Sequence, residues 1–187
     1  NPITDWNKYE EELLERLGSD NKMVRLLTNR AKTDPKRIVF AEADQLDVLK
    51  AAQIEKQKGA DMVIGYVETH SRKETAELCE GIELIPRNRY TYKSAILEEM
   101  DLDSIIARKP QIVLVDELAH TNAPGSRHNK RYQDVQEILD HGIHVYTTVN
   151  VQHLESRSQI VAQITGIVVR ETLPDDVFES ADDIELV

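Results

Sequence analysis

An acidic pair follows an apolar run in the middle of the chain. Residues 111–122 read QIVLVDELAHTN, which places Asp116 and Glu117 directly after a run that is typical of a buried strand. In nucleotide hydrolases an acid at the end of a strand coordinates magnesium, directly or through water, beside a residue that positions the attacking water. The pair is therefore a candidate Walker B element, with Asp116 as the Mg²⁺ ligand. Acids also end strands simply to cap the next turn, so the pair alone leaves both interpretations open.

A Walker B element works with a phosphate-binding loop, and the sequence contains no such motif. The loop has the pattern G-x-x-x-x-G-K-[ST], whose backbone amides and lysine hold the phosphates, and none of the seven glycines begins it. After the first expected strand the chain reads FAEADQLDVLKAA, so Glu42, Asp44 and Asp47 take the place of the loop. Two like charges about 4 Å apart repel by about 4 kcal/mol at an effective dielectric constant of about 20. We expect this turn to repel a triphosphate.

A basic cluster follows the acidic pair. Arg127, His128, Lys130 and Arg131 lie in and after a loop rich in Asn, Pro, Gly and Ser. In a nucleotide-binding protein, Arg127, Lys130 and Arg131 would contact phosphates while Asp116 and Glu117 held magnesium. A solvated loop explains the same residues without a ligand. We expect no cofactor, with low-affinity Mg-ATP binding as the alternative, and a small anion as the other candidate ligand at the strand ends.

Hydrophobic periodicity predicts the elements that position these residues. Apolar runs bounded by turn residues indicate strands, and apolar residues at three- and four-residue steps indicate helices. The expected strands cover residues 37–43, 61–67, 82–87, 111–117, 143–150, 167–174 and 183–187. The expected helices cover residues 5–18, 21–32, 44–59, 71–81, 95–109 with a break near Met100, 131–142, 151–166 and 174–180.

The order of these elements predicts an α/β fold. Strands that alternate with helices indicate βαβ units, and strands that are apolar throughout are typical of a parallel sheet covered on both faces. Right-handed crossovers then give a three-layer αβα sandwich with a mainly parallel sheet, P-loop NTPase-like or Rossmann-like, preceded by N-terminal helices. We expect residues 1–187 to form a single domain. Ligands of such sheets bind at the carboxyl ends of the strands, where Asp116 and Glu117 lie.

Composition narrows the class of protein. The chain has 187 residues, a net charge of −11 and one cysteine. A strongly negative surface disfavours nucleic acid and anionic membranes, so we expect neither as a partner. No apolar run approaches the roughly 20 residues of a membrane helix, and a lone cysteine suits a reducing compartment. These features predict a cytoplasmic protein, and they leave its oligomeric state open.

Two family resemblances divide the chain. Residues from about 55 to 187 resemble the N-terminal cytoplasmic domain of the KdpD sensor histidine kinases, through the string GADMVIGYVETHSRKETAEL at 59–78, the continuous stretch 96–166, and VRETLPD at 169–175. This resemblance implies a P-loop NTPase-like fold, with an early Walker A loop, a Walker B strand at 112–116, and ATP binding that modulates a kinase and phosphatase balance. Residues 1–54 lack that Walker A loop. Through NRAKTDPKRIVFAEADQLDVLKAAQ they resemble the start of the phosphate acetyltransferase domain of bacterial malic enzymes.

Both parent families open a parallel sheet with a strand, a turn and a helix, so one opening can replace the other. The simplest interpretation is an engineered fold chimera that is not an enzyme and keeps only half of a nucleotide site. Two alternatives stay open. One is a regulatory nucleotide-binding module of a potassium-sensing histidine kinase, and the other is a fragment of an acyl-phosphate or CoA transferase.

Overall fold

A computed structural model describes residues 38–41, 45–68 and 73–186. The helices predicted at 5–18 and 21–32, the acids Glu42 and Asp44, and the start of the helix predicted at 44–59 lie outside these residues.

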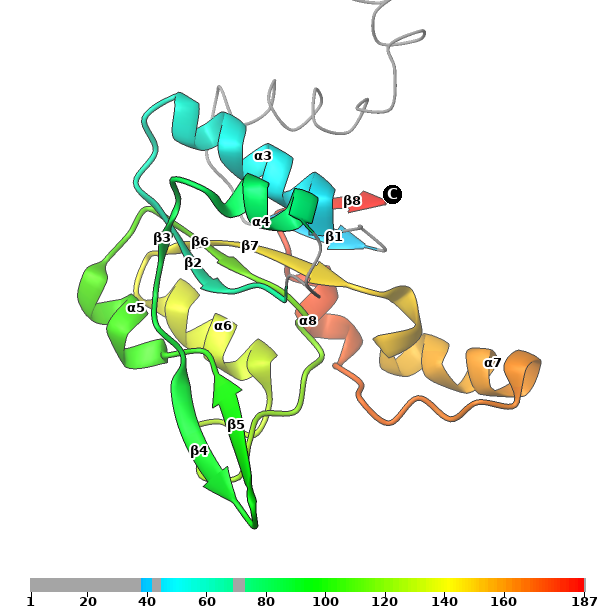
Figure 1. The fold of residues 1–187 in the computed structure, drawn as a ribbon. Helices are drawn as coiled ribbons and strands as arrows, with labels where there is room; N and C mark the ends of the chain where they lie inside the picture. Colours follow the sequence, from blue (N-terminus) through cyan, green and yellow to red (C-terminus); the bar gives the residue numbers. More distant parts are fainter. Residues whose placement is uncertain (1–37, 42–44, 69–72, 187) are drawn as a thin grey trace, which may run out of the picture.

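A six-stranded sheet forms the centre of the described fold (Figure 1). Its strand order is β3-β2-β6-β7-β1-β8, and every neighbouring pair is parallel. The expectation of a mainly parallel sheet is confirmed. The strands are β1 Ile38–Ala41, β2 Met62–Tyr66, β3 Glu83–Leu84, β6 Ile112–Val115, β7 His144–Val149 and β8 Asp183–Leu186.

Helices cover both faces of this sheet, which gives the three predicted layers (Figure 1). On one face lie α3 Gln45–Gln57 and α4 Lys73–Cys79, and on the other lie α5 Leu102–Arg108, α6 Arg131–Asp140 and α8 Asp175–Glu179. The one-turn helix η1 Val151–His153 leads into α7 Glu155–Thr165, which projects from the body.

Alternation along the buried strands divides the core into two clusters. Successive side chains of a strand point to opposite faces, so Val113 of β6 packs on the α5 and α6 side while Leu114 packs on the α3 side. Gly65 of β2 allows α5 to approach closely, because a Cβ atom there would lie 2.8 Å from Cδ1 of Ile105. The layers therefore form around central strands, β2 and β6, that are buried along their whole length.

The structure contradicts one helix prediction. Residues 95–99 are not helical: β5 Ala95–Glu99 pairs antiparallel with β4 Asn88–Tyr92, and Lys93 in the turn between them has a φ of 55°. The helix begins only at Leu102, because the side chain of Asp101 accepts a hydrogen bond from the Ser104 amide at 3.0 Å and caps the first turn.

The strand predicted at 167–174 is also wrong. This segment forms no strand and makes only a single bridge, between Leu154 and Leu173. The strand at 183–187 and the helix at 174–180 are confirmed as β8 and α8, apart from Val187, which lies outside the described residues. An apolar run such as IVV at 167–169 is therefore insufficient by itself to form a strand.

Candidate functional site

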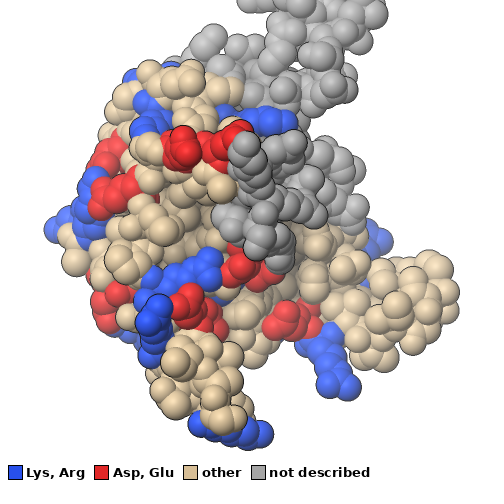
Figure 2. Space-filling view, in the orientation of Figure 1, with Lys and Arg blue, Asp and Glu red and all other residues tan. Residues whose placement is uncertain are grey.

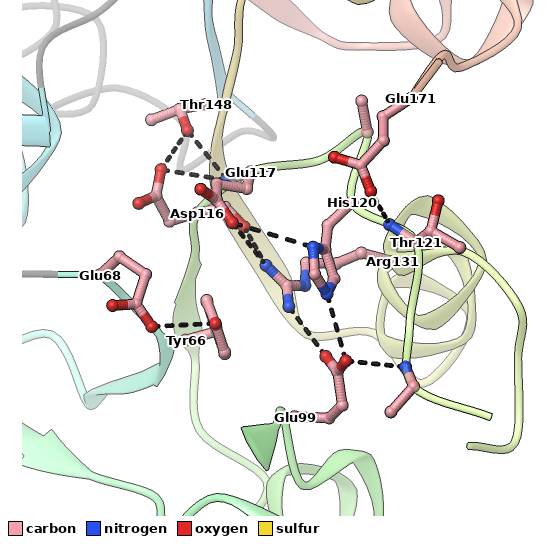
Figure 3. Close-up of polar contacts among 12 residues, drawn as sticks. Tyr66, Glu68, Glu99, Asp116, Glu117, His120, Thr121, Arg131, Thr148 and Glu171 are labelled. Atoms are coloured by element: carbon pink, nitrogen blue, oxygen red, sulfur yellow. Dashed lines mark hydrogen bonds and ion pairs between the residues drawn. The ribbon is translucent and has the colours of Figure 1, made fainter. Parts of the chain in front are cut away.

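Asp116 lies where the sequence predicts it, directly after β6 at the carboxyl edge of the sheet. Its side chain is 6% exposed. One carboxylate oxygen accepts hydrogen bonds from the backbone amide of Glu117, at 3.0 Å, and from the hydroxyl of Thr148 (Figure 3). Thr148 belongs to β7, the strand beside β6. Two adjacent parallel strands therefore fix the orientation of this carboxylate.

Glu117 adopts a backbone conformation that few non-glycine residues adopt. Its φ is 58°, in the left-handed region, which costs roughly 1–2 kcal/mol for an L-residue. In this conformation its amide also donates to the Thr148 hydroxyl oxygen at 3.1 Å. Its carboxylate lies 3.5 Å from Nη1 of Arg131 and 4.0 Å from Nδ1 of His120. The turn after β6 thus holds the two acids in different environments.

Arg131, the first residue of α6, lies beneath this turn with no exposed side-chain surface. Nη1 donates to the backbone carbonyl of Asp116 at 3.1 Å, and Nη2 donates to Glu99 at 3.0 Å (Figure 3). Its Cζ atom lies 3.7 Å from the centre of the Tyr66 ring, within the range of a cation–π interaction. Arg131 therefore links α6, the end of β6 and the end of β5.

Glu99, at the end of β5, is the buried acid that pairs with Arg131. Its side chain is 8% exposed. It accepts from the Ala123 amide at 2.7 Å and lies 3.1 Å from Nε2 of His120. Burial raises the pKa of Glu99, but hydrogen bonds from His120 and Ala123 together with the Arg131 charge outweigh it, so the pKa lies below its usual range. We expect an ionised carboxylate at neutral pH.

Tyr66 completes the cluster from the end of β2. Its hydroxyl donates to Glu68 at 2.9 Å, and Glu68 in turn accepts from Arg87 at 2.7 Å. The Arg87 guanidinium lies 4.2 Å from the centre of the Tyr66 ring. Burial is the main cause that raises the pKa of Tyr66 to about 12, so the phenol stays protonated.

Sequence reasoning missed Glu99 and Tyr66, and it gave Thr148 no role in the site. Glu99 was missed because residues 95–109 were assigned to a helix. Thr148 carried a usable signal, because it stands at the carboxyl end of a predicted strand, on the edge where ligands of parallel sheets bind.

The other predicted basic residues contact acceptors outside this cluster. Arg127 pairs with Asp103 and, at 2.6 Å, with Glu137. Lys130 donates from Nζ to the Thr121 hydroxyl at 2.8 Å and to the Ala119 carbonyl at 3.3 Å. The structure thus brings together Asp116, Glu117 and Arg131, and it places the charged groups of Arg127 and Lys130 on partners of their own.

The oxygen atoms at the end of β6 are of the kind that binds a hard cation such as magnesium. Asp116, Glu117 and Thr148 offer only oxygen atoms, which magnesium prefers. In the described part of the chain, however, no group of three or more His, Cys, Asp or Glu side chains converges on a common point. Among protein groups, a magnesium ion here would be held mainly by Asp116, and water or a bound phosphate would have to supply the remaining oxygen ligands.

Comparison with known proteins identifies the family. The KdpD family model, described as the osmosensitive K⁺ channel His kinase sensor domain, matches residues 43–187. The chain belongs to the KdpD family. The sensor protein KdpD of Escherichia coli (strain K12) is 54% identical over 140 residues, which are 75% of this chain and 16% of that protein. The chain therefore spans less than a fifth of the length of this KdpD relative.

Two other similarities are weaker. An NADP-dependent malic enzyme of Rhizobium meliloti is 33% identical over 85 residues, which are 44% of this chain and 11% of the enzyme. A crystal structure of Bacteroides Pif1 bound to ssDNA superposes with a TM-score of 0.41 and 11% identity, covering 90% of this chain and 41% of that one. Among the described residues, no helix has the length and apolarity needed to cross a membrane.

Proposed function

We propose that this chain is a regulatory domain of a potassium-sensing histidine kinase that does not hydrolyse nucleotide. Membership of the KdpD family supports the regulatory role. The lack of hydrolysis rests on one observation. The acid at the end of β6 is present, and Thr148 orients its carboxylate. The segment that opens the same sheet, however, contains no glycine-rich loop.

Charge at the carboxyl edge supports the same proposal. A phosphate-binding loop offers backbone amides and a lysine to the phosphates, but the segment after β1 offers Glu42, Asp44 and Asp47. The buried cation at the end of β6, Arg131, already donates to Glu99 and to the Asp116 carbonyl. A triphosphate would meet more negative than positive charge, so its binding is disfavoured.

The similarity to a malic enzyme supports a second part of the proposal. The KdpD match begins at residue 43, and a segment of this chain is 33% identical to the malic enzyme. We infer that residues 1–54 come from the malic enzyme family and replace the first strand and loop of a KdpD domain. An engineered chimera of this kind keeps the connectivity of the sheet, because both parents open with a strand followed by a helix.

Isothermal titration with Mg-ATP tests the proposal. We expect a dissociation constant weaker than about 100 μM, which corresponds to less than about 5.5 kcal/mol of binding free energy. Asp116→Asn removes the magnesium ligand, and Asp140→Asn at the exposed end of α6 is the matched control. The proposal would be contradicted if the wild type bound Mg-ATP tightly, Asp116→Asn abolished this binding and Asp140→Asn preserved it.

That contradictory result would favour the alternative of a regulatory nucleotide-binding module. Asp116 would then hold magnesium, and Arg127, Lys130 and Arg131 would contact phosphates. For this to happen, Arg127 would have to leave Glu137 and Lys130 would have to leave Thr121. This alternative therefore predicts that nucleotide binding changes the environment of the loop at residues 120–130.

A further inference from the structure

A small pocket lies between α6, β7 and α8, on the face of the sheet opposite α3. Its walls are mostly apolar, and Val135, Val145 and Val177 supply one residue from each of the three elements. Its mouth is polar, because Gln136 and Ser180 also line it and are exposed. None of the charged residues described above lines this pocket, so it is separate from the site at the end of β6.

Thr147 of β7 brings a hydroxyl to the buried end of the pocket. The residue is 3% exposed and lines the pocket. Its Oγ1 atom has no hydrogen-bond partner within the described part of the chain. The next residue, Thr148, points to the opposite face of the sheet, where its hydroxyl donates to Asp116. Because burying a hydroxyl without a partner costs free energy, Thr147 requires a hydrogen-bonding group inside the pocket.

Volume decides which ligand can reach this hydroxyl. The cavity measures about 30 Å³. A water molecule needs about 10–15 Å³ of such space, whereas sites for organic ligands usually enclose about 300–1,000 Å³. Charge agrees with this choice. Side chains of Lys, Arg, Asp and Glu lie close together on the visible surface of the molecule (Figure 2), but none of them lines the pocket, so an ionic ligand finds no counter-charge there.

We propose that this pocket is a hydration site, which holds about one or two ordered water molecules and links β7 to α8 through them. A buried water usually makes about three hydrogen bonds, and Thr147 supplies one of them. Ser180 supplies another, because its hydroxyl donates to the Val177 carbonyl at 2.8 Å and keeps lone pairs to accept from water. Tyr132 and Gln136 line the same pocket and carry the polar groups that complete the set.

The bound water gives α8 a polar attachment beside its apolar one. Val177, Phe178 and Ala181 pack against the core cluster on this face of the sheet. A water that bridges two protein groups is nearly as favourable as a direct hydrogen bond, so it joins the hydroxyls of Thr147 and Ser180 across the boundary between strand and helix. The strand therefore holds the helix through solvent as well as through packing.

Crystal structures of the wild type and of two Thr147 variants test the proposal. In the wild type we expect electron density for a water within about 3.2 Å of Oγ1 of Thr147. Thr147→Ser keeps the hydroxyl and should keep this water. Thr147→Val keeps the shape of the side chain but removes the hydroxyl, so the water should be lost.

Magnetic relaxation dispersion of the solvent provides the matching measurement in solution, because it counts water molecules that stay buried. We expect Thr147→Val to remove the contribution of about one water or two. Ala181→Leu fills the pocket from the other side without touching Thr147, and it should remove the same contribution. Thr165→Val is the matched control, because the Thr165 hydroxyl is exposed and donates to the Val161 carbonyl within α7.

The outcomes are distinct. Circular dichroism shows whether each variant keeps its fold, and Ala181→Leu decides the question if Thr147→Val does not fold. A wild-type pocket that is dry overturns the proposal, as does a protein group that bonds to the Thr147 hydroxyl in place of water. The proposal also fails if Thr147→Val and Ala181→Leu both keep the water, or if Thr165→Val loses it equally.

Discussion

At the scale of single residues, the site depends on how charge is compensated inside the fold. Arg131 shows what sequence leaves out. Its charge and its place at the start of a helix follow from the sequence, and both made it a candidate phosphate contact. Its complete burial depends on Tyr66 and Glu99, which come from distant parts of the chain. No local pattern connects three residues so widely separated.

Removing Arg131 is expected to destabilise the protein strongly. Arg131→Met leaves Glu99 buried without its cation, and breaking a buried pair in this way costs about 3–5 kcal/mol. Urea denaturation should show this loss in the free energy of unfolding. The double variant Glu99→Gln with Arg131→Met removes both charges and should recover part of the loss. Equal stability of the wild type and Arg131→Met would show that the pair contributes nothing.

Thr148 tests the orientation of Asp116 without touching its charge. Thr148→Val removes the hydroxyl that donates to the Asp116 carboxylate and accepts from the Glu117 amide. Burying a carboxylate with one bond fewer should lower the free energy of unfolding by about 1–3 kcal/mol. Thr148→Ser keeps the hydroxyl and is expected to keep most of the stability. Thermal denaturation of the two variants side by side measures the difference.

At the scale of elements, the positions of strands and helices were predicted best where hydrophobic periodicity and burial agree. The strands β2, β6 and β7 are mainly apolar and almost fully buried, and they were placed correctly, because a parallel sheet buries both faces of each strand. The prediction failed at residues 95–99, where AILEE has good helix formers but pairs with Asn88–Tyr92. Pairing with the preceding strand of the hairpin outweighs a weak local preference. Glu99 was missed for this reason.

The boundary between β5 and α5 can be tested through its cap. Asp101→Ala removes the acceptor for the Ser104 amide and hydroxyl, and losing such a cap costs about 1 kcal/mol. Asp101→Asn keeps an acceptor oxygen and should cost much less. Chemical denaturation compares the two variants. An alanine variant as stable as the asparagine variant would mean that tertiary packing alone fixes the start of α5.

At the scale of the whole molecule, acid should unfold the chain through its paired carboxylates. Hydrogen bonds from Arg108, His128 and Ser156 lower the pKa of Asp61, Glu137 and Asp175 respectively. The pKa of Glu99 is also lowered, while burial raises that of Asp134. A carboxyl whose pKa is lowered on folding stabilises the protein above its unfolded value, and this stability is lost as pH falls through the folded value.

The window of this loss follows from the ordinary pKa values, 4.5 for Glu and 3.8 for Asp. We expect the free energy of unfolding to change little between pH 7 and pH 5, and to fall progressively below about pH 4.5. Asp134 opposes the trend, since its raised pKa favours the protonated folded form, and the expected fall comes from the four carboxyls whose pKa is lowered. Urea denaturation from pH 7 to pH 3 measures the profile. Glu137→Gln should flatten it, and a stability that rises on acidification would show that relief of the −11 charge dominates.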